Sequence, residues 1–334
     1  APTIAFGAGT GAINFNQSDA VTITSAISGA GTLNQLGAGT TTLSGPNTYS
    51  GDTTISAGVL RLAGENAAGS GRIIQTALDS LVEFLGGGRM TNDMTVFQYS
   101  FANSLEAAGQ VTLADTASSI AVFADQAVTG SGSFVGAGGL TKLGAGTLAL
   151  TAGNSFSGPL SVVAGTLQLD SLSGAAAGSV TSIAVTSGAT LLVSQSNQVN
   201  NGASVTLSGG TIRTASGVSE VFGNLSVTGS GFLDFGTTSY ANANTISFGT
   251  YTTTPSALLT INNFNFGSTM TFGSNLSSDD LATFSFTNGG IASSSWDEGA
   301  GTFTITAIPE PSTYVAAIGL LALMLWPLRH RLIK

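Results

Sequence analysis

The side chains in this sequence that are able to carry acid–base chemistry are almost all carboxylates. His330 is the only histidine and the chain contains no cysteine, which excludes Ser-His-Asp triads, Cys-His pairs and the common zinc sites. A polysaccharide hydrolase or lyase needs instead two or more Asp or Glu side chains that converge on one face. Isolated acidic residues are more often solvated turns, so we expect no catalytic residue. The acidic residues that would have to converge, and the arginines near them in sequence, are Asp79, Glu83, Asp93, Asp115, Asp125, Arg72 and Arg89.

Two acidic pairs further along the chain are candidates for a cation site. They are Asp279-Asp280 and Asp297-Glu298, and Ca²⁺ prefers several oxygen ligands within one loop. Neither pair lies in an EF-hand or in a Gly-Gly-x-Gly-x-Asp nonapeptide pattern. We therefore expect exposed loop acids at both places, and neither a metal nor a cofactor.

Residues 236–307 carry a series of spaced aromatic residues. One interpretation is that their rings are buried in terminal rungs or in a capping β module, because a solenoid needs its open end covered. The alternative is an exposed platform of coplanar rings that binds sugar. We favour burial. The residues are Phe248, Tyr251, Phe264, Phe266, Phe272, Phe284, Phe286 and Trp296.

Composition indicates β structure on an acidic body. Charged residues make up only 7% of the 334 residues, whereas glycine occurs 46 times; with many Thr, Val and Leu residues, this favours strands separated by tight turns. Residues 1–308 hold 5 Lys/Arg against 16 Asp/Glu, a net charge of −11. Such a body repels nucleic acid, so we exclude that partner. The chain begins at Ala1 without Met, as expected of a mature chain or a fragment whose export leader is missing.

An internal repeat recurs with an offset of 107 residues. Residues 36–62 align with residues 143–169, so that Asn47 matches Asn154 and Gly58 matches Gly165. Leucines alternate with other residues in both copies, which is the period of a strand with one buried face. Fainter echoes recur every 20–22 residues at Val185-Thr186, Val205-Thr206 and Val227-Thr228. That period predicts a parallel β-helix, with about 14 rungs of ~4.8 Å in a rod of roughly 65 Å.

The two strong copies resemble the autotransporter-associated β-strand repeat, written Gly-x-Gly-Thr-Leu-x-Leu-x-Gly-x-Asn-x-Tyr-x-Gly. The resemblance covers residues 27–62 and 128–169; the first copy departs at Thr41-Thr42 and the second has Phe156 in place of Tyr. It implies a right-handed β-helix stalk on a secreted surface protein, and it says almost nothing about chemistry. We predict β-helix repeats over 1–235, and terminal rungs or a capping β module over 236–307.

The C-terminal 27 residues have the order of a membrane-linked sorting signal. Val315–Leu328 is uncharged and mostly apolar; as a helix it would reach ~21 Å, and Thr313 and Tyr314 extend it toward the ~30 Å of a bilayer core. The basic residues that follow place this end in the cytoplasm. They are Arg329, Arg331 and Lys334. The plain interpretation is a membrane anchor.

The residues before this apolar run make the tail resemble the PEP-CTERM sorting signal of Gram-negative bacteria. They are Pro309, Glu310, Pro311 and Ser312. The resemblance implies recognition by an exosortase, a membrane enzyme that cleaves near the motif and passes the body on to the cell surface or the extracellular matrix. It identifies an address and not an activity.

Taken together, these patterns predict an all-β protein, a right-handed parallel β-helix with a short C-terminal transmembrane helix. We expect an exported, non-enzymatic structural protein of the surface or matrix, associated with biofilm or exopolysaccharide and held transiently at the inner membrane. Its expected partners are an exosortase-type enzyme, the membrane, extracellular polysaccharide and further copies of itself. The alternatives are a carbohydrate-binding adhesin and, less favoured, a polysaccharide lyase or hydrolase.

Overall fold

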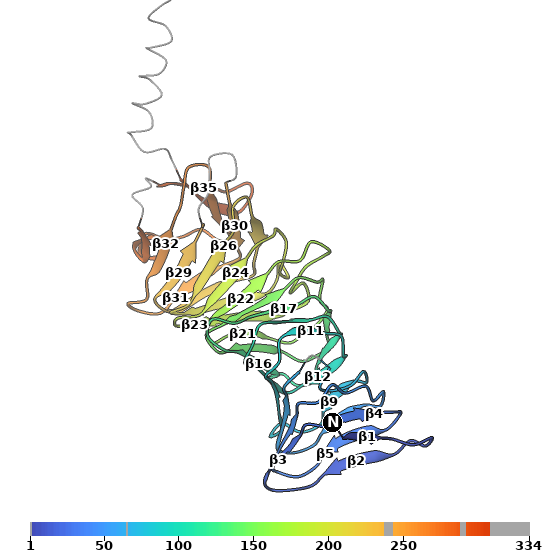
Figure 1. Ribbon diagram of the computed structural model, residues 1–334. Coiled ribbons are helices and arrows are strands. Elements are labelled where there is room, and N and C mark those ends of the chain that lie inside the picture. The colour runs from blue at the N-terminus through green and yellow to red at the C-terminus, as the bar shows by residue number, and fades with distance from the viewer. Residues whose placement is uncertain (1, 65, 237–242, 288–291, 308–334) are drawn as a thin grey trace, which may run out of the picture.

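The fold is an all-β parallel solenoid of about 13 turns, which confirms the predicted architecture while its handedness stays a prediction. In the computed structural model, the described residues are 2–64, 66–236, 243–287 and 292–307. The strands stack along one axis from the N-terminal rungs toward β35 (Ala292–Asp297) (Figure 1). Most of the short strands alternate outward and buried residues, as in Thr147–Leu150, where Leu148 and Leu150 are buried.

Two long parallel sheets run along most of the rod. Sheet I has twelve strands: β3 (Ala20–Ile23), β6 (Thr40–Leu43), β8 (Val59–Leu62), β10 (Leu81–Phe84), β13 (Gln98–Phe101), β16 (Ser119–Val122), β19 (Leu140–Leu143), β21 (Leu160–Val162), β23 (Ser182–Thr186), β25 (Ser204–Ser208), β28 (Leu225–Gly229) and β31 (Tyr251–Thr253). Sheet II has ten strands: β11 (Gly88–Met90), β14 (Leu105–Ala107), β17 (Ala127–Gly130), β20 (Thr147–Leu150), β22 (Thr166–Leu169), β24 (Thr190–Val193), β26 (Thr211–Thr214), β29 (Gly231–Asp234), β32 (Leu259–Asn262) and β34 (Phe284–Phe286).

Shorter sheets complete the cross-section at the two ends. Sheet III belongs to the N-terminal half: β2 (Ala12–Phe15), β5 (Thr32–Gln35), β7 (Thr53–Ile55), β9 (Ile73–Gln75), β12 (Met94–Val96), β15 (Val111–Leu113) and β18 (Phe134–Val135). Sheet IV belongs to the C-terminal end: β27 (Ser219–Val221), β30 (Thr245–Phe248), β33 (Thr269–Phe272), β36 (Thr302–Ala307) and β35. The first strand, β1 (Thr3–Ala5), pairs only with β4 (Ala26–Ser28) among the described strands.

One apolar core follows the axis, because every rung contributes its inward residues to the same cluster. The corners are tight enough to require glycine in the left-handed region. Gly58 and Gly165 have φ of +63° and +65°, and a Cβ added to either would lie 2.4 Å from a backbone oxygen of the preceding rung. This equivalence explains why glycine recurs at both positions of the repeat.

Residues 64–127, which fit the repeat poorly, still form rungs of the solenoid. Strand β10 begins at Leu81, after a turn at Leu78 and Asp79. The rungs from β11 to β19 have a third strand, as in β11, β12 and β13. This segment therefore adds strands to the rungs and does not interrupt the solenoid.

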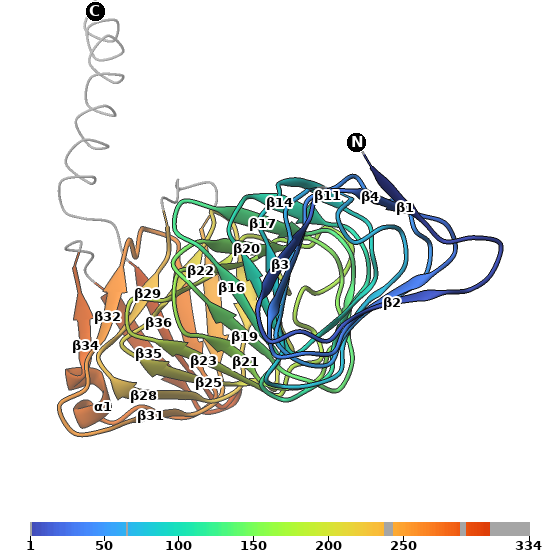
Figure 2. The same cartoon turned by 60° about the horizontal axis from the view of Figure 1, so that its bottom comes forward.

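The parallel stacking ends in an antiparallel element. Strand β36 pairs antiparallel with both β33 and β35, while the short helix α1 (Ser278–Ala282) lies next to β31 and β34 (Figure 2). The division of the chain at residue 236 stays a prediction. No helix among the described residues is long and apolar enough to cross a membrane, and the predicted sorting motif, apolar helix and basic stop of 308–334 lie outside those residues.

Candidate functional site

The carboxylates that a catalytic site would need lie at different corners of the cross-section. Asp79 and Asp115 lie between sheets III and I, Asp93 between sheets II and III, and Asp125 between sheets I and II. Glu83 projects outward from β10 and forms an ion pair with Arg61. The solenoid therefore spreads these acids around its circumference rather than bringing a pair together. Among the described residues, no cluster of three or more metal-ligating side chains occurs.

The arginines tie neighbouring rungs together. Each of the four in the described part of the chain contacts a carboxylate of an adjacent rung: Arg61–Glu83, Arg72–Asp52, Arg89–Glu106 and Arg213–Asp234. The first three pairs are substantially exposed, and exposed pairs of this kind contribute about 0.2–1 kcal/mol. The hydrogen bond and charge of Arg72 lower the pKa of Asp52, against the opposing effect of partial burial.

In each of the two acidic pairs considered for a cation site, one aspartate accepts a hydrogen bond from at least one nearby backbone N–H group. Asp280 and Ser277 form a capping box at the start of α1. Asp297 accepts hydrogen bonds from the backbone N–H groups of Gly299 and Ala300, at 2.9 and 3.0 Å. These contacts are those of turn-forming residues.

Most aromatic residues of 236–307 pack inside the solenoid. Phe248, Tyr251, Phe264 and Phe272 are buried, and Phe284 and Phe286 pack against the same core. The rings of Phe248 and Phe272 stack with centroids 5.8 Å apart. Trp296 pairs across the strands with buried Phe303 and is 37% exposed. These contacts match the buried interpretation, and the described aromatic residues of this segment form no coplanar outward platform.

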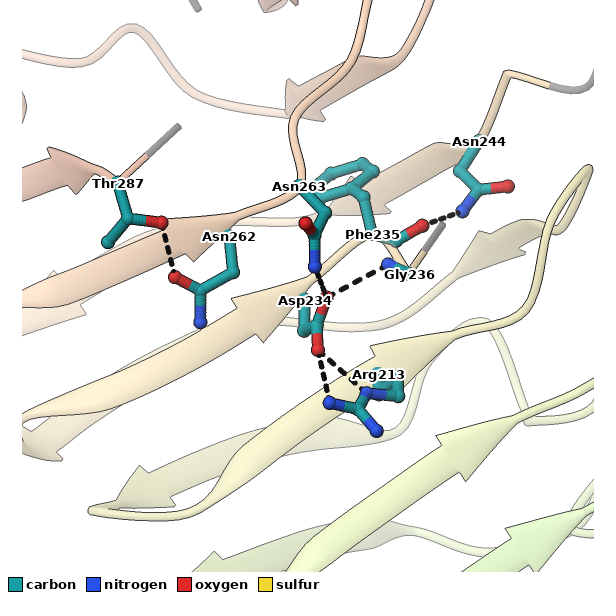
Figure 3. A network of polar contacts seen from close by, with 8 residues as sticks. All are labelled: Arg213, Asp234, Phe235, Gly236, Asn244, Asn262, Asn263 and Thr287. Atoms are coloured by element: carbon teal, nitrogen blue, oxygen red, sulfur yellow. Dashed lines mark hydrogen bonds and ion pairs between the residues drawn. The ribbon is translucent and has the colours of Figure 1, made fainter. Parts of the chain in front are cut away.

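A polar hollow opens instead on the outer face of sheet II. It has a volume of about 370 Å³ and is lined by Leu192, Arg213, Thr214, Ala215, Ser216, Asp234, Gly236 and Asn263. Arg213 and Asp234 occupy paired positions on β26 and β29. Figure 3 shows Asp234 between Arg213 on one side and Asn263 on the other.

Asp234 forms hydrogen bonds with several of the residues that line this hollow. Its Oδ2 accepts from Nε and Nη2 of Arg213, both at 2.7 Å, and its Oδ1 accepts from Asn263 Nδ2 at 2.7 Å and from the Gly236 N–H at 2.9 Å. Burial by itself would raise the pKa of Asp234, but these hydrogen bonds and the charge of Arg213 outweigh it and lower the pKa. Asp234 is therefore ionised at neutral pH, and it holds the 54% exposed side chain of Arg213 in place.

Polar side chains continue across the neighbouring strands of sheet II on both sides of the hollow. One register row runs from β22 to β32 through Gln168, Leu192, Arg213, Asp234 and Asn262. Gln168 donates to Ser194 Oγ at 3.0 Å, and Thr287 donates to Asn262 Oδ1 at 2.6 Å. We call this row and its flanking hydrogen-bond partners the polar track.

Sequence reasoning missed the polar track because polar residues are common in this chain. A signal was nevertheless present, since Arg213 and Asp234 lie 21 residues apart, which is one rung of the predicted period. The pair of Arg61 and Glu83 has nearly the same spacing, 22 residues. In the sequence, two opposite charges separated by one rung period therefore indicate side chains that lie next to each other on neighbouring rungs.

Comparison with known proteins bears on the repeats. Residues 33–62 and 140–169 each match the passenger-associated-transport-repeat family. Over 97 residues, or 29% of the chain, the sequence is 40% identical to the adhesin BmaC autotransporter of Brucella suis biovar 1 (strain 1330), and the aligned part spans 3% of that adhesin. The autotransporter-associated β-strand repeats predicted from the sequence are confirmed: the chain carries two passenger-associated-transport repeats, built into successive rungs of a parallel β-solenoid.

Proposed function

We propose that this protein is an exported, surface-exposed β-solenoid with a structural or adhesive role. The observation that carries the proposal is a parallel solenoid of about 13 turns that includes two passenger-associated-transport repeats. The similarity to a protein named as an autotransporter adhesin supports it. The role is non-enzymatic in this proposal, and the dispersal of the candidate carboxylates over three corners is its support.

The proposed route to the surface runs through the C-terminal tail. An exosortase-type enzyme recognises Pro309, Glu310, Pro311 and Ser312, while Val315–Leu328 holds the chain transiently in the inner membrane. The basic residues Arg329, Arg331 and Lys334 stay on the cytoplasmic side. Cleavage releases the body to the cell surface or matrix, where extracellular polysaccharide and other copies of the chain are its partners.

Mass spectrometry of the protein from surface, culture-fluid and membrane fractions tests this route. We expect the surface form to end near Pro309–Ser312, and Glu310→Ala to accumulate in membranes with Lys334 intact. Glu298→Ala is the matched control, an acid changed upstream of the motif. An intact Lys334 confined to the membrane fraction in the unaltered protein would mean a simple anchor. A chain found only in the cytoplasm would overturn the surface role.

A carbohydrate-binding adhesin is the second candidate function. The observation that favours it is the polar hollow on sheet II and not the aromatic residues of 236–307, most of which are buried.

A further inference from the structure

We propose that the polar track on sheet II binds an extended, uncharged polysaccharide that lies along the rod, with the hollow at Arg213 as its main contact. This inference rests on the proposed surface role and names the ligand class for it.

The hollow presents fixed hydrogen-bonding groups beside an apolar wall. Arg213 has five N–H donors, of which Nε and Nη2 contact Asp234, and its side chain is 54% exposed. A guanidinium that is already held loses little rotamer entropy when a ligand binds. Leu192 adds apolar surface to the lining, and the volume of about 370 Å³ lies within the range of ligand pockets. Sugar rings, which combine hydroxyl groups with C–H faces, suit such a surface.

The polar track continues this chemistry from rung to rung. Gln168, Arg213 and Asn262 lie in one register row, with Leu192 and Asp234 between them. Five stacked strands at ~4.8 Å spacing extend over roughly 19 Å. A linear polysaccharide laid along the axis would meet an exposed or partly exposed polar side chain on three of these five strands, Gln168, Arg213 and Asn262, while Asp234 is buried beneath Arg213. The register of the sheet therefore favours a polymer over a single small sugar.

The charges of the described residues select an uncharged polymer. All four described arginines are paired with carboxylates, and Lys142 is buried with its Nζ against three carbonyl oxygens. Acidic residues outnumber basic ones by 16 to 5 over residues 1–308. Uronate or sulfated polymers would meet net repulsion and no unpaired described cation. A neutral chain meets neither obstacle.

The test measures binding of the full-length chain in detergent to soluble polymers by affinity electrophoresis. The neutral probes are galactomannan, mixed-linkage β-glucan and dextran, and the anionic probes are polygalacturonate and alginate. We expect at least one neutral probe to bind, and Arg213→Gln/Asp234→Asn to weaken that binding at least tenfold. The double change removes the charge pair together, so that no buried carboxylate is left alone. The matched control, Arg72→Gln/Asp52→Asn, removes an equally short ion pair outside the hollow and should bind within twofold of the unaltered chain.

Four results would overturn the inference: no neutral probe binds, the Arg213/Asp234 variant binds normally, the control loses as much affinity, or an anionic probe binds best. Circular dichroism of both variants shows whether the solenoid is retained; if the Arg213/Asp234 variant unfolds, Asn262→Ala at the end of the polar track takes its place, with an expected loss of at least threefold. Protease accessibility on intact cells reports surface exposure separately. Lost glycan binding with intact surface exposure removes this inference alone, whereas lost exposure removes the proposed function.

Discussion

The two repeat copies have matching sequences but lie on different faces of the rod. In the first copy, β5 and β7 belong to sheet III and β6 and β8 to sheet I. In the second copy, the equivalent strands β19 and β21 belong to sheet I, and β20 and β22 to sheet II. The three-stranded rungs between the copies shift the repeat by one face. The repeat therefore encodes a local unit of two strands and a corner, and not a position in the cross-section.

The two copies also hold equivalent corners with different side chains. In the first, Gln35 Nε2 donates to the carbonyls of Gly37 and Gly39, and Thr41 Oγ1 donates to Gln35 Oε1 at 2.6 Å. In the second, Lys142 Nζ reaches three carbonyl oxygens, and Leu148 replaces the threonine. Both corners satisfy buried carbonyls. Each corner requires a side-chain donor that is long enough to reach these carbonyl oxygens. Where the donor changes from Gln35 to Lys142, the neighbouring residue changes as well, from Thr41 to Leu148.

The largest effect is expected where the two copies are identical. Asn47 accepts from the Ile27 N–H and donates to the Ala67 carbonyl; Asn154 likewise accepts from Phe134 and donates to Ala176. Asn47→Ala leaves a buried donor and acceptor unpaired, at about 1–3 kcal/mol each, whereas the bonds of Asn154 are only partly buried. We expect Asn47→Ala to lose about 4 kcal/mol and Asn154→Ala about 2 kcal/mol, measured by urea unfolding.

Asn→Asp at the same two positions is the control, because at low pH the neutral carboxyl keeps both an acceptor oxygen and one O–H donor. It should then lose less than Asn→Ala. Equal and small losses for all four variants, below ~1 kcal/mol, would show that the shared asparagine does not bridge the rungs energetically.

The comparison also shows which parts of the fold the sequence could predict. Leu148/Leu150 and Gly58/Gly165 were readable because strand alternation and left-handed corners depend on near neighbours. The shift of the second copy by one face was not readable, because it depends on how many strands the intervening rungs contain. The hollow depends on Asp234 and Asn263, which lie 29 residues apart, a spacing unequal to one rung of the predicted period. Contacts within a rung period could be predicted, and contacts across irregular rungs could not.

The lysine corner should respond to alkaline pH and the glutamine corner should not. Burial lowers the pKa of Lys142 to about 8 from 10.5. Between these values the unfolded chain binds more protons than the folded chain, so stability should rise as pH increases from 8 to 10.5. The full gain is about 3 kcal/mol. Urea unfolding at pH 7.5, 9 and 10.5 measures it.

Lys142→Gln/Leu148→Thr, which transplants the first corner into the second, should flatten that profile. Gln35→Met serves as the matched control, because it disrupts the other corner without removing a titrating group, and it should leave the slope unchanged. A transplanted protein that keeps the alkaline rise would show that Lys142 is not its source.

A buried carboxylate, Glu220, should make the stability fall as pH rises, which is opposite to the effect of Lys142. Glu220, buried on β27, accepts from the backbone N–H groups of Gln198 and Val199 at 2.7 and 3.2 Å. Burial raises its pKa to about 7 from 4.5, against the lowering effect of these hydrogen bonds. Its contribution to stability should be full below pH 4.5 and lost as pH rises through 7, by at most about 3 kcal/mol.

Glu220→Gln should remove this loss, and unfolding between pH 4.5 and 8 measures the difference. Asp234→Asn is the contrasting control: the lowered pKa of Asp234 stabilises the fold above its unfolded value of 3.8 and ceases to do so as pH falls. The two variants should therefore flatten separate parts of the profile. A protein whose stability between pH 4.5 and 8 is unaffected by Glu220→Gln would contradict the assignment.

The smallest expected effect concerns the aromatic residue that differs between the copies. Tyr49 OH lies 2.6 Å from Thr53 Oγ1, whereas the second copy has Phe156 and Leu160 at the two equivalent positions. Tyr49→Phe alone removes the shorter of the two hydrogen bonds of the buried threonine, whose Oγ1 also donates to the Ala68 carbonyl at 3.5 Å, and should lose about 1 kcal/mol. Tyr49→Phe/Thr53→Leu installs the pair of the second copy and should recover most of that loss, because two apolar groups need no partner.

A double-mutant cycle by urea unfolding gives the coupling free energy between the two positions, with Phe156→Tyr/Leu160→Thr as the reciprocal exchange. Coupling near zero in both directions would mean that the two positions vary independently, and that only the corner donors change in pairs.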